Sequence, residues 1–224
     1  MHNVADIPLV QPDWKHHRVI HSKYPPKNLF DADDAINSLL GEVESLTNER
    51  IVNWRDFVLP EDARFGNGWG AVMGSFCYPR LGRFSTERAG AYYCSDKIAV
   101  AIAEWCHHTA RYWQEFGFDA EASATVRSYT GHFTQPLLDV RGYPELHGHD
   151  ATYQYKISNA LANQARDAGA YGLLYNSVRH PGGVCAALLR PTATTPVTQS
   201  AHYVVIFNGY TFTDFAKVGE FHAI

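Results

Sequence analysis

The sequence predicts an α+β fold, a single domain whose mixed and mostly antiparallel sheet is flanked by helices. Short apolar or aromatic runs bounded by turn-forming residues recur along the chain and crowd its second half. Three longer segments carry their apolar residues at helical spacing. No internal repeat, low-complexity tract or Ser/Gly linker divides the 224 residues, a length that suits one core better than two. We therefore take residues 1–224 as a single domain.

The first half of the chain is expected to form, in order, a strand at 19–20, a helix over 31–46, a strand over 91–94 and a helix over 95–113. Three aspartates lie in the first turn of the first helix, where negative charge suits the helix dipole. Ser95 is well placed to cap the second helix, whose apolar stripe includes Ile98 and Ile102.

The second half is expected to form strands over 124–133 and 137–140, a helix over 151–168, strands over 172–178 and 184–189, and a hairpin of 203–207 with 210–212. Gly169 follows the helix, as glycine does at many helix ends. The turn of the hairpin is expected at Asn208-Gly209, a strong signal for a two-residue turn.

Composition and charge exclude several classes of protein. With 19 basic and 23 acidic side chains the formal charge is −4, which argues against nucleic-acid binding through a whole-molecule basic field but allows a local anion pocket. No apolar run approaches the roughly 18 residues of a membrane span, and no signal-peptide pattern occurs. The four cysteines form no C-x-x-C pair and are expected to be buried thiols in a reducing compartment. We therefore expect a cytoplasmic protein.

Two sequence motifs that are known from binding sites lack the neighbouring residues that such a site needs. The segment 66–71 fits G-x-G-x-x-G/A, but the polar residues 60–65 precede it where a dinucleotide-binding turn needs a buried strand. We expect a mobile or tightly turning loop there. His107 and His108 would point about 100° apart on a helix, and no H-E-x-x-H, G-K-[ST] or G-x-S-x-G motif occurs. We expect no metal site.

Polar residues stand inside apolar segments at three places before residue 110. Arg83 opens a core-like segment, Tyr93 ends an aromatic strand, and Glu104 lies within an apolar helix. On a helical wheel Glu104 shares a face with Lys97, the small Ala101 and His108. Two interpretations follow: a solvated face with a Lys–Glu pair, or a carboxylate that faces a cleft beside Ala101.

A fourth segment, residues 175–183, places polar side chains at the end of an apolar strand, among them Asn176, Ser177, Arg179 and His180. Strand ends are favoured places for functional sites, because a rigid sheet positions the side chains at its rim. The alternative is a plain strand-to-turn connection shaped by the Pro-Gly-Gly sequence at 181–183.

The runs GRFSTERAGAYYCSDKIAVAIAEWCHH and YGLLYNSVRHPGGVCAALLRP resemble the RES domain, and HRVIHSKYPPKNLFD resembles the opening of a longer RES subgroup. The resemblance is strongest over residues 16–30, 81–108 and 171–191. Arg83 and Tyr93 are 10 residues apart, and Tyr93 and Glu104 are 11 apart, which is a specific spacing. One departure is Ser85, where many relatives have Asn, and it affects only a local hydrogen bond.

The resemblance implies a toxin of a RES–Xre type toxin–antitoxin pair, with a fold similar to ADP-ribosyltransferases and with NAD⁺ as its substrate rather than as a prosthetic cofactor. The residues it maps to the NAD⁺ pocket are Glu104, Arg83, Tyr93 and Ser177, with Arg18 and Arg179 as helpers. It also implies a cognate helix-turn-helix (Xre-like) antitoxin that occludes the pocket. DNA binding would then belong to the antitoxin rather than to this chain. The resemblance also allows a homodimer within the toxin–antitoxin complex.

Cleavage of the nicotinamide–ribose bond passes through an oxocarbenium-like sugar, and each mapped residue suits one part of it. Glu104 would stabilise the positive charge, and Arg83 would bind the pyrophosphate, with Arg18 or Arg179 second. Tyr93 would stack on nicotinamide. Ser177 would donate a hydrogen bond to phosphate or ribose rather than act as a nucleophile, because no His or Lys is evidently paired with it.

The acceptor stays open. Water would make the protein an NAD⁺ glycohydrolase, inorganic phosphate a phosphorylase, and a protein side chain an ADP-ribosyltransferase. A non-catalytic nucleotide-binding or antitoxin-binding module is the alternative from another class. The three glycines within 66–70 lower the cost of backbone motion, and so we expect a flexible segment near the mouth of the pocket.

Overall fold

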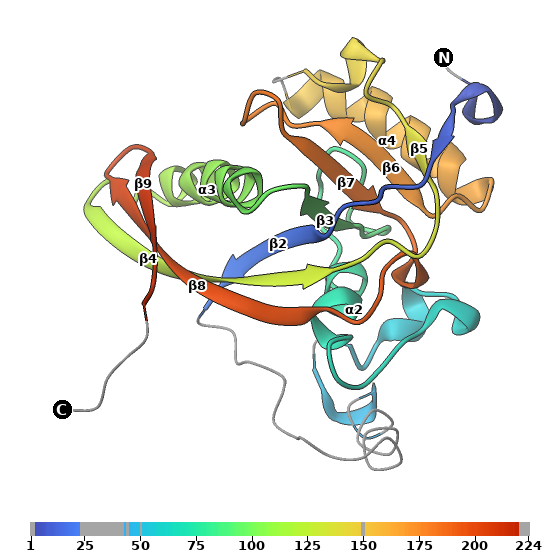
Figure 1. The fold of residues 1–224 in the computed structure, drawn as a ribbon, viewed down its shortest axis with the longest axis horizontal. Helices are drawn as coiled ribbons and strands as arrows, with labels where there is room; N and C mark the ends of the chain where they lie inside the picture. Colours follow the sequence, from blue (N-terminus) through green and yellow to red (C-terminus); the bar gives the residue numbers. More distant parts are fainter. Residues whose placement is uncertain (1–2, 23–42, 44, 50, 149–150, 220–224) are drawn as a thin grey trace.

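The computed structural model describes residues 3–22, 43, 45–49, 51–148 and 151–219, which form one mixed nine-stranded sheet with few helices (Figure 1). The strands are β1 (Leu9–Val10), β2 (His16–His21), β3 (Tyr92–Ser95), β4 (Glu121–Gly131), β5 (Leu137–Asp139), β6 (Gly172–Asn176), β7 (Val184–Leu188), β8 (Thr198–Asn208) and β9 (Phe212–Lys217). The α-helices are α2 (Gly70–Cys77), α3 (Ile98–Glu115) and α4 (Ala151–Asp167). Short 3-10 helices are η1 (Val4–Asp6), η2 (Trp54–Asp56), η3 (Pro60–Asp62), η4 (Pro144–Leu146) and η5 (Pro191–Ala193). The predicted α+β fold class is confirmed.

The strand order across the sheet is β1-β5-β6-β7-β3-β2-β4-β8-β9. Neighbouring strands are antiparallel except for β5 and β6, which are parallel. Because β3 and β6 both pair antiparallel with β7, they run in the same direction and end at the same edge. The chain leaves β3 toward α3 and leaves β6 toward Ser177, and so this edge gathers the predicted functional segments.

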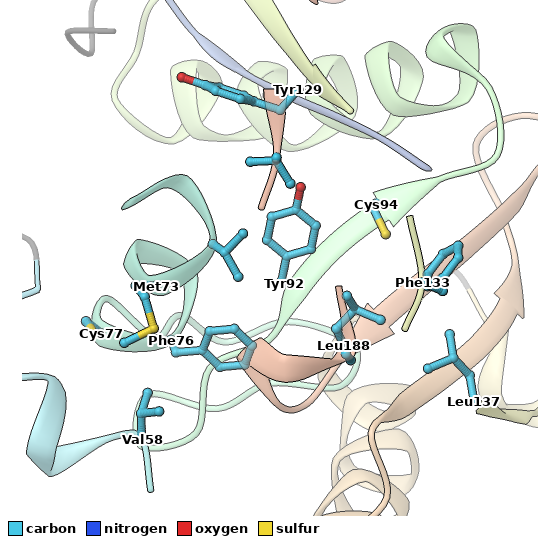
Figure 2. Close-up of a cluster of buried hydrophobic side chains, with 14 of the residues drawn as sticks. Val58, Met73, Phe76, Cys77, Tyr92, Cys94, Tyr129, Phe133, Leu137 and Leu188 are labelled. Atoms are coloured by element: carbon cyan, nitrogen blue, oxygen red, sulfur yellow. The ribbon is translucent and has the colours of Figure 1, made fainter. Parts of the chain in front are cut away.

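One face of the sheet packs on α2. Tyr92 of β3 points to this face and lies among Met73 and Phe76 of α2, Leu188 of the adjacent β7 and Tyr129 of β4 (Figure 2). The side chains are almost fully buried, and an apolar cluster of this size supplies the main free energy of folding. The cysteines in it, such as Cys77 and Cys94, are buried free thiols, as the spacing predicts.

The opposite face packs on α3 and α4, which lie on the same side of the sheet in Figure 1 while α2 lies on the other. Ile102 of α3 belongs to a buried cluster with Val126 and Val205, and Leu161 of α4 belongs to a second cluster with Leu173. Successive side chains of a strand alternate between faces, and so Tyr93 points to the α3–α4 face while Tyr92 does not. None of the described helices is long and apolar enough to cross a membrane.

The structure corrects the start of the second predicted helix. Ser95 does not cap it but is the last residue of β3, where it pairs with Cys185 and places Oγ 3.4 Å from that residue's Sγ. The helix begins at Ile98 after an extended Lys97 without a side-chain cap. The reason is that the β3–β7 ladder continues through Ser95 and so holds it in extended backbone. Of the helix predicted over 31–46, residues 31–42 and 44 lie outside the described residues.

The structure also moves the hairpin turn by one residue. Asn208 pairs with Thr211, and its side chain accepts hydrogen bonds from the amides of Tyr210 and Thr211, so the two central residues are Gly209 and Tyr210. Gly209 has φ +90°, the left-handed backbone that glycine adopts at low cost. Gly169 after α4 likewise has φ +72°, as the helix-end signal predicts.

The glycine-rich loop 66–70 does not lie near the predicted site. Its neighbours Phe65 and Trp69 pack into the cluster on the α2 face, and the Gly68 carbonyl accepts the Val197 amide at 3.2 Å. Gly68 has φ +79°, and a Cβ there would meet Val197 O at 2.6 Å. The loop is therefore tightly turned against the sheet, on the face opposite Glu104. The expectation that this segment lies at the mouth of the pocket is wrong.

Candidate functional site

Five of the six predicted site residues, all but Arg18, lie on the α3–α4 face, near the edge where β3 and β6 end. They come from four places in the chain: Glu104 from α3, Ser177 and Arg179 from the turn after β6, Tyr93 from β3, and Arg83 from the segment between α2 and β3. A glycine makes the approach of the first two segments feasible. A Cβ on Gly183 would lie 2.6 Å from a methyl carbon of Val100, so only glycine lets this turn pack against α3.

Glu104 and Ser177 are in direct contact. Ser177 Oγ donates to Glu104 Oε1 at 2.7 Å and accepts from the backbone amides of Arg179 at 3.2 Å and His180 at 3.1 Å. The single hydroxyl proton of Ser177 is therefore committed to the carboxylate. The Cys185 thiol lies 3.9 Å from the same oxygen, and burial raises its pKa to about 12, which keeps it protonated.

This geometry separates the two interpretations of Glu104. Lys97 does not pair with Glu104, because its ammonium lies 3.7 Å from Asp96 Oδ2. The carboxylate instead faces inward, beside the buried Ala101, and is held by a residue from another element. Glu104 therefore does not belong to a plain solvated helix face.

Arg83 braces the segment that precedes α4. Its guanidinium donates to the carbonyl oxygens of Leu146 and Gly148, the second at 3.1 Å, and lies 5.6 Å from the centroid of the Tyr155 ring. The side chain is 7% exposed, so little of it faces solvent. In this structure two of its N–H groups are thus engaged by backbone rather than open to a ligand.

Tyr93 is held by its hydroxyl. The oxygen accepts from the Phe84 amide at 2.9 Å and lies 3.0 Å from Ser85 Oγ, and burial raises the pKa of this phenol. Ser85 in turn donates to the Arg80 carbonyl at 2.8 Å, so the departure from Asn at this position still supports a local hydrogen-bond network. The anchored hydroxyl fixes the orientation of the half-buried ring.

The site carries more positive than negative charge. Desolvation lowers the pKa of His108, one helical turn after Glu104, and the charge of Glu104 opposes this. Three guanidinium groups lower it further, those of Arg179, Arg111 and Arg83. Desolvation also lowers the pKa of Arg179, again opposed by Glu104. A carboxylate beside Arg179, with Arg83 and Arg111 near the adjacent His108, can attract an anion and still present one negative group to a cationic centre.

Sequence reasoning missed several of these residues. His108 was placed on the helix face of Glu104 but not counted as a site residue, and Arg111, seven positions after Glu104, has the spacing of the same face, which is the signal that could have found it. Tyr155 of α4 had no such signal, because only the packing of α4 brings it to Arg83. Among the described residues, no group of three or more His, Cys, Asp or Glu side chains could hold a metal ion.

The structure does not bring Arg18 to this group. Arg18 of β2 donates to the Tyr93 carbonyl at 3.0 Å, and its guanidinium lies 4.6 Å from the centroid of the Tyr92 ring. The Tyr92 ring belongs to the α2 face, so the Arg18 side chain lies across the sheet from Glu104. Its place supports β3 rather than a shared pocket with Glu104.

One comparison with known proteins identifies a family for this chain. The sequence profile of the RES domain matches residues 60–208. A chain in the crystal structure of the M. tuberculosis MbcT–MbcA toxin–antitoxin complex is similar at 13% sequence identity and a TM-score of 0.44, with 96% of this chain and 90% of that chain covered. A comparison with curated proteins finds no significant match.

Proposed function

This chain belongs to the RES domain family, and we propose that it is a toxin-like enzyme that consumes NAD⁺ by cleaving the nicotinamide–ribose bond. The observation that carries the proposal is the Glu104 carboxylate, which Ser177 holds at 2.7 Å and whose charge acts on Arg179, with Arg83 and Arg111 acting on the neighbouring His108. A dianionic pyrophosphate and a sugar that becomes cationic need opposite charges within one site. The RES resemblance supplies the identity of the substrate.

Glu104 acts on the developing charge. As the bond between the anomeric carbon and the pyridinium nitrogen breaks, its electron pair moves to nicotinamide, which leaves neutral, and positive charge grows on the ribose. A carboxylate fixed beforehand stabilises that charge more in the transition state than in the ground state. Ser177 keeps the Glu104 carboxylate in place, because its proton points to Oε1 and its oxygen is pinned by two backbone amides.

The geometry changes the assignment of the arginines. The Arg83 guanidinium already donates to the Leu146 and Gly148 carbonyls, so we assign it the role of holding the segment before α4 and adding positive charge. Arg179 is half-buried beside Glu104, and we assign it the first contact with pyrophosphate. Tyr93, anchored at its hydroxyl, offers its ring for stacking on nicotinamide.

The acceptor decides the enzyme class. Water would add at the anomeric carbon and release a proton, giving ADP-ribose; phosphate would give ADP-ribose with a phosphate at that carbon; a protein side chain would give a modified protein. Incubation of the purified protein with NAD⁺, with and without phosphate and with a protein extract, followed by mass analysis of all products, identifies the acceptor. Stable NAD⁺ in every reaction would favour the non-catalytic binding module.

The decisive variant is Glu104→Gln, which keeps the shape and deletes the charge. We expect NAD⁺ turnover to fall about 100-fold or more, with a far smaller change in NAD⁺ affinity. Glu121→Gln, at an exposed position of β4, is the control and should match the parent. A Glu104→Gln protein that folds and turns over NAD⁺ at the parental rate would overturn the mechanism.

By the same resemblance we propose a partner and a compartment. A free NAD⁺-consuming enzyme would harm its host, so we propose a co-encoded helix-turn-helix antitoxin that covers the site in the cytoplasm. Purified antitoxin should block NAD⁺ consumption at equimolar concentration. Harmless expression of the chain by itself, with full NAD⁺ turnover in the presence of that antitoxin, would contradict the proposal.

A further inference from the structure

The parallel ladder between β5 and β6 stops early beside the site. The Val140 amide donates to the Leu174 carbonyl at 2.9 Å, and in a continued parallel ladder the Val140 carbonyl would next accept the Asn176 amide. Instead the Val140 carbonyl accepts the Tyr143 amide at 3.1 Å, because the chain turns away there. The Asn176 amide therefore needs another acceptor.

His147 supplies that acceptor. Its Nε2 accepts the Asn176 amide at 3.0 Å, and its Nδ1 lies 2.8 Å from the Tyr143 carbonyl. A carbonyl can only accept, so Nδ1 carries the proton, and a backbone amide can only donate, so Nε2 is unprotonated. Both contacts require the neutral ring in this tautomer. The side chain of Asn176 adds a second link to the same segment by donating to the Arg141 carbonyl at 3.0 Å.

The neighbours of these two residues are the ones that build the site. His147 lies between Leu146 and Gly148, whose carbonyls hold the Arg83 guanidinium. Asn176 directly precedes Ser177, whose hydroxyl holds Glu104. The contact between His147 and Asn176 thus joins the part of the chain that fixes Arg83 to the part that fixes the carboxylate.

We propose that His147 is a positioning residue, whose neutral ring latches the 140–148 segment to the end of β6 and so sets Ser177 and Glu104 relative to Arg83. The role in turnover rests on the proposed function, while the latch itself is a property of the fold. His147 touches neither Glu104 nor Ser177 through any described contact, and it acts through Asn176.

The latch opens when the ring takes a second proton, because Nε2–H and the Asn176 amide would then both be donors. Burial lowers the pKa of His147 from its usual 6.5, and the Arg83 charge lowers it further, while the Tyr143 carbonyl and Glu145 act in the opposite direction. The Tyr175 ring, 6.5 Å away between centroids, is the neighbour on β6. The ring thus stays neutral at neutral pH and becomes charged only in acid.

Two substitutions test the two hydrogen bonds of the His147 ring separately. His147→Gln carries a carbonyl oxygen near the position of Nε2 and can still accept the Asn176 amide. His147→Asn carries its amide near the position of Nδ1 and can reach only the Tyr143 carbonyl. We expect His147→Asn to lower kcat for NAD⁺ about tenfold with KM within about twofold, and His147→Gln to restore kcat to within about twofold of the parent. His202→Gln, at a half-exposed position of β8, is the control.

The pH profile separates positioning from a merely structural role. The parent should lose kcat in acid as the ring charges, and His147→Gln should lose that limb, while His202→Gln keeps it. Parental kcat in His147→Asn, or an unchanged acid limb in His147→Gln, would overturn the positioning role.

Two measurements on the folded full chain need no activity. Nitrogen NMR of the imidazole should report Nδ1–H with an unprotonated Nε2, and the Asn176 amide should exchange with solvent faster in His147→Asn than in the parent or His147→Gln. A protonated Nε2 at neutral pH, or equal exchange in all three proteins, would overturn the latch. Absence of NAD⁺ turnover in the parent would overturn the proposed function and the role of His147 in turnover. The NMR and exchange measurements alone would then decide whether the latch exists.

Discussion

Ser177 Oγ donates its only proton to Glu104 Oε1 at 2.7 Å, and Ser177 Oγ itself accepts hydrogen bonds from two backbone amides. The hydroxyl therefore has no proton left for a phosphate or a ribose, which is the role that the sequence alone suggests for it. Its chemistry in this arrangement is to orient the carboxylate. A nucleophilic role is equally unsupported, because the carboxylate itself accepts the proton of Ser177, and no imidazole or amine among the described residues is hydrogen-bonded to Oγ.

Removal of that hydroxyl should therefore impair turnover more than binding. We expect Ser177→Ala to lower kcat for NAD⁺ about 10- to 100-fold, because Glu104 loses the contact that preorganises it, with a small change in KM. Ser128→Ala is a matched control, since Ser128 is as buried and exchanges two hydrogen bonds with Ala201 on β8, away from Glu104. A Ser177→Ala protein with parental kcat and normal melting temperature would contradict this role.

Arg179 and Arg83 should respond differently to truncation. Arg179→Ala removes a half-buried cation beside Glu104, and we expect KM for NAD⁺ to rise about tenfold or more with little change in melting temperature. Arg83→Ala leaves the Leu146 and Gly148 carbonyls without their donor, and we expect a loss of about 1–3 kcal/mol in the free energy of unfolding. Steady-state kinetics and urea unfolding of both variants check this, and a reversed pattern would return the phosphate contact to Arg83.

Much of the fold, and the grouping of several candidate site residues, could be predicted from the sequence because the signals were local. The apolar runs of β6 and β7 and the helix of α4 lie where alternation, helical spacing and Gly169 place them. The spacing of Arg83, Tyr93 and Glu104 reflects one continuous passage from the segment before β3 into α3, so the chain itself carries these residues to one region.

The predictions that failed depend on strand pairing and on which face of the sheet a side chain occupies. Ser95 looks like a helix cap until β7 is known to pair with it, and Arg18 looks like a helper until the register of β2 with β3 assigns it to the α2 face. His147 gave no usable signal, since its importance depends on the Asn176 amide, 29 positions away in the chain. Contacts of that kind follow from packing rather than from any local pattern.

A stability prediction concerns the buried ion pair between η3 and η5. Asp62 is 3% exposed and accepts from Arg190 Nε at 2.6 Å, from Arg190 Nη2 at 3.0 Å and from Thr192 Oγ1 at 2.7 Å. We expect Asp62→Asn to lower the free energy of unfolding by about 2–4 kcal/mol, because the bidentate pair is lost and a cation is left in a partly buried place.

The more exposed bidentate pair of Asp139 with Arg141 is the comparison, and Asp139→Asn should cost about 1 kcal/mol or less. Urea unfolding of the two variants measures both values. Equal losses would show that burial of the first pair adds nothing.

The last prediction concerns His16, which is fully buried in β2 with Nε2 2.7 Å from Thr194 Oγ1. Burial lowers its pKa from 6.5 to about 3, with the charges of His17, His132 and Arg18 acting in the same direction. Below pH 6.5 the unfolded chain takes up a proton at this ring and the folded protein does not, so the stability present above pH 6.5 is lost as the pH falls toward 3. The slope for one such proton is about 1.4 kcal/mol per pH unit.

Urea unfolding across that pH window measures the effect, and His16→Gln should flatten the curve by about one proton because the titrating ring is gone. His202→Gln, at a half-exposed position of β8, should keep the parental slope. The ring stays neutral inside the fold, since a charged His16 would lie without a counter-ion beside Arg18 and the rings of Tyr92 and Phe133. A His16→Gln protein with the parental pH dependence would mean that the acid sensitivity arises elsewhere in the chain.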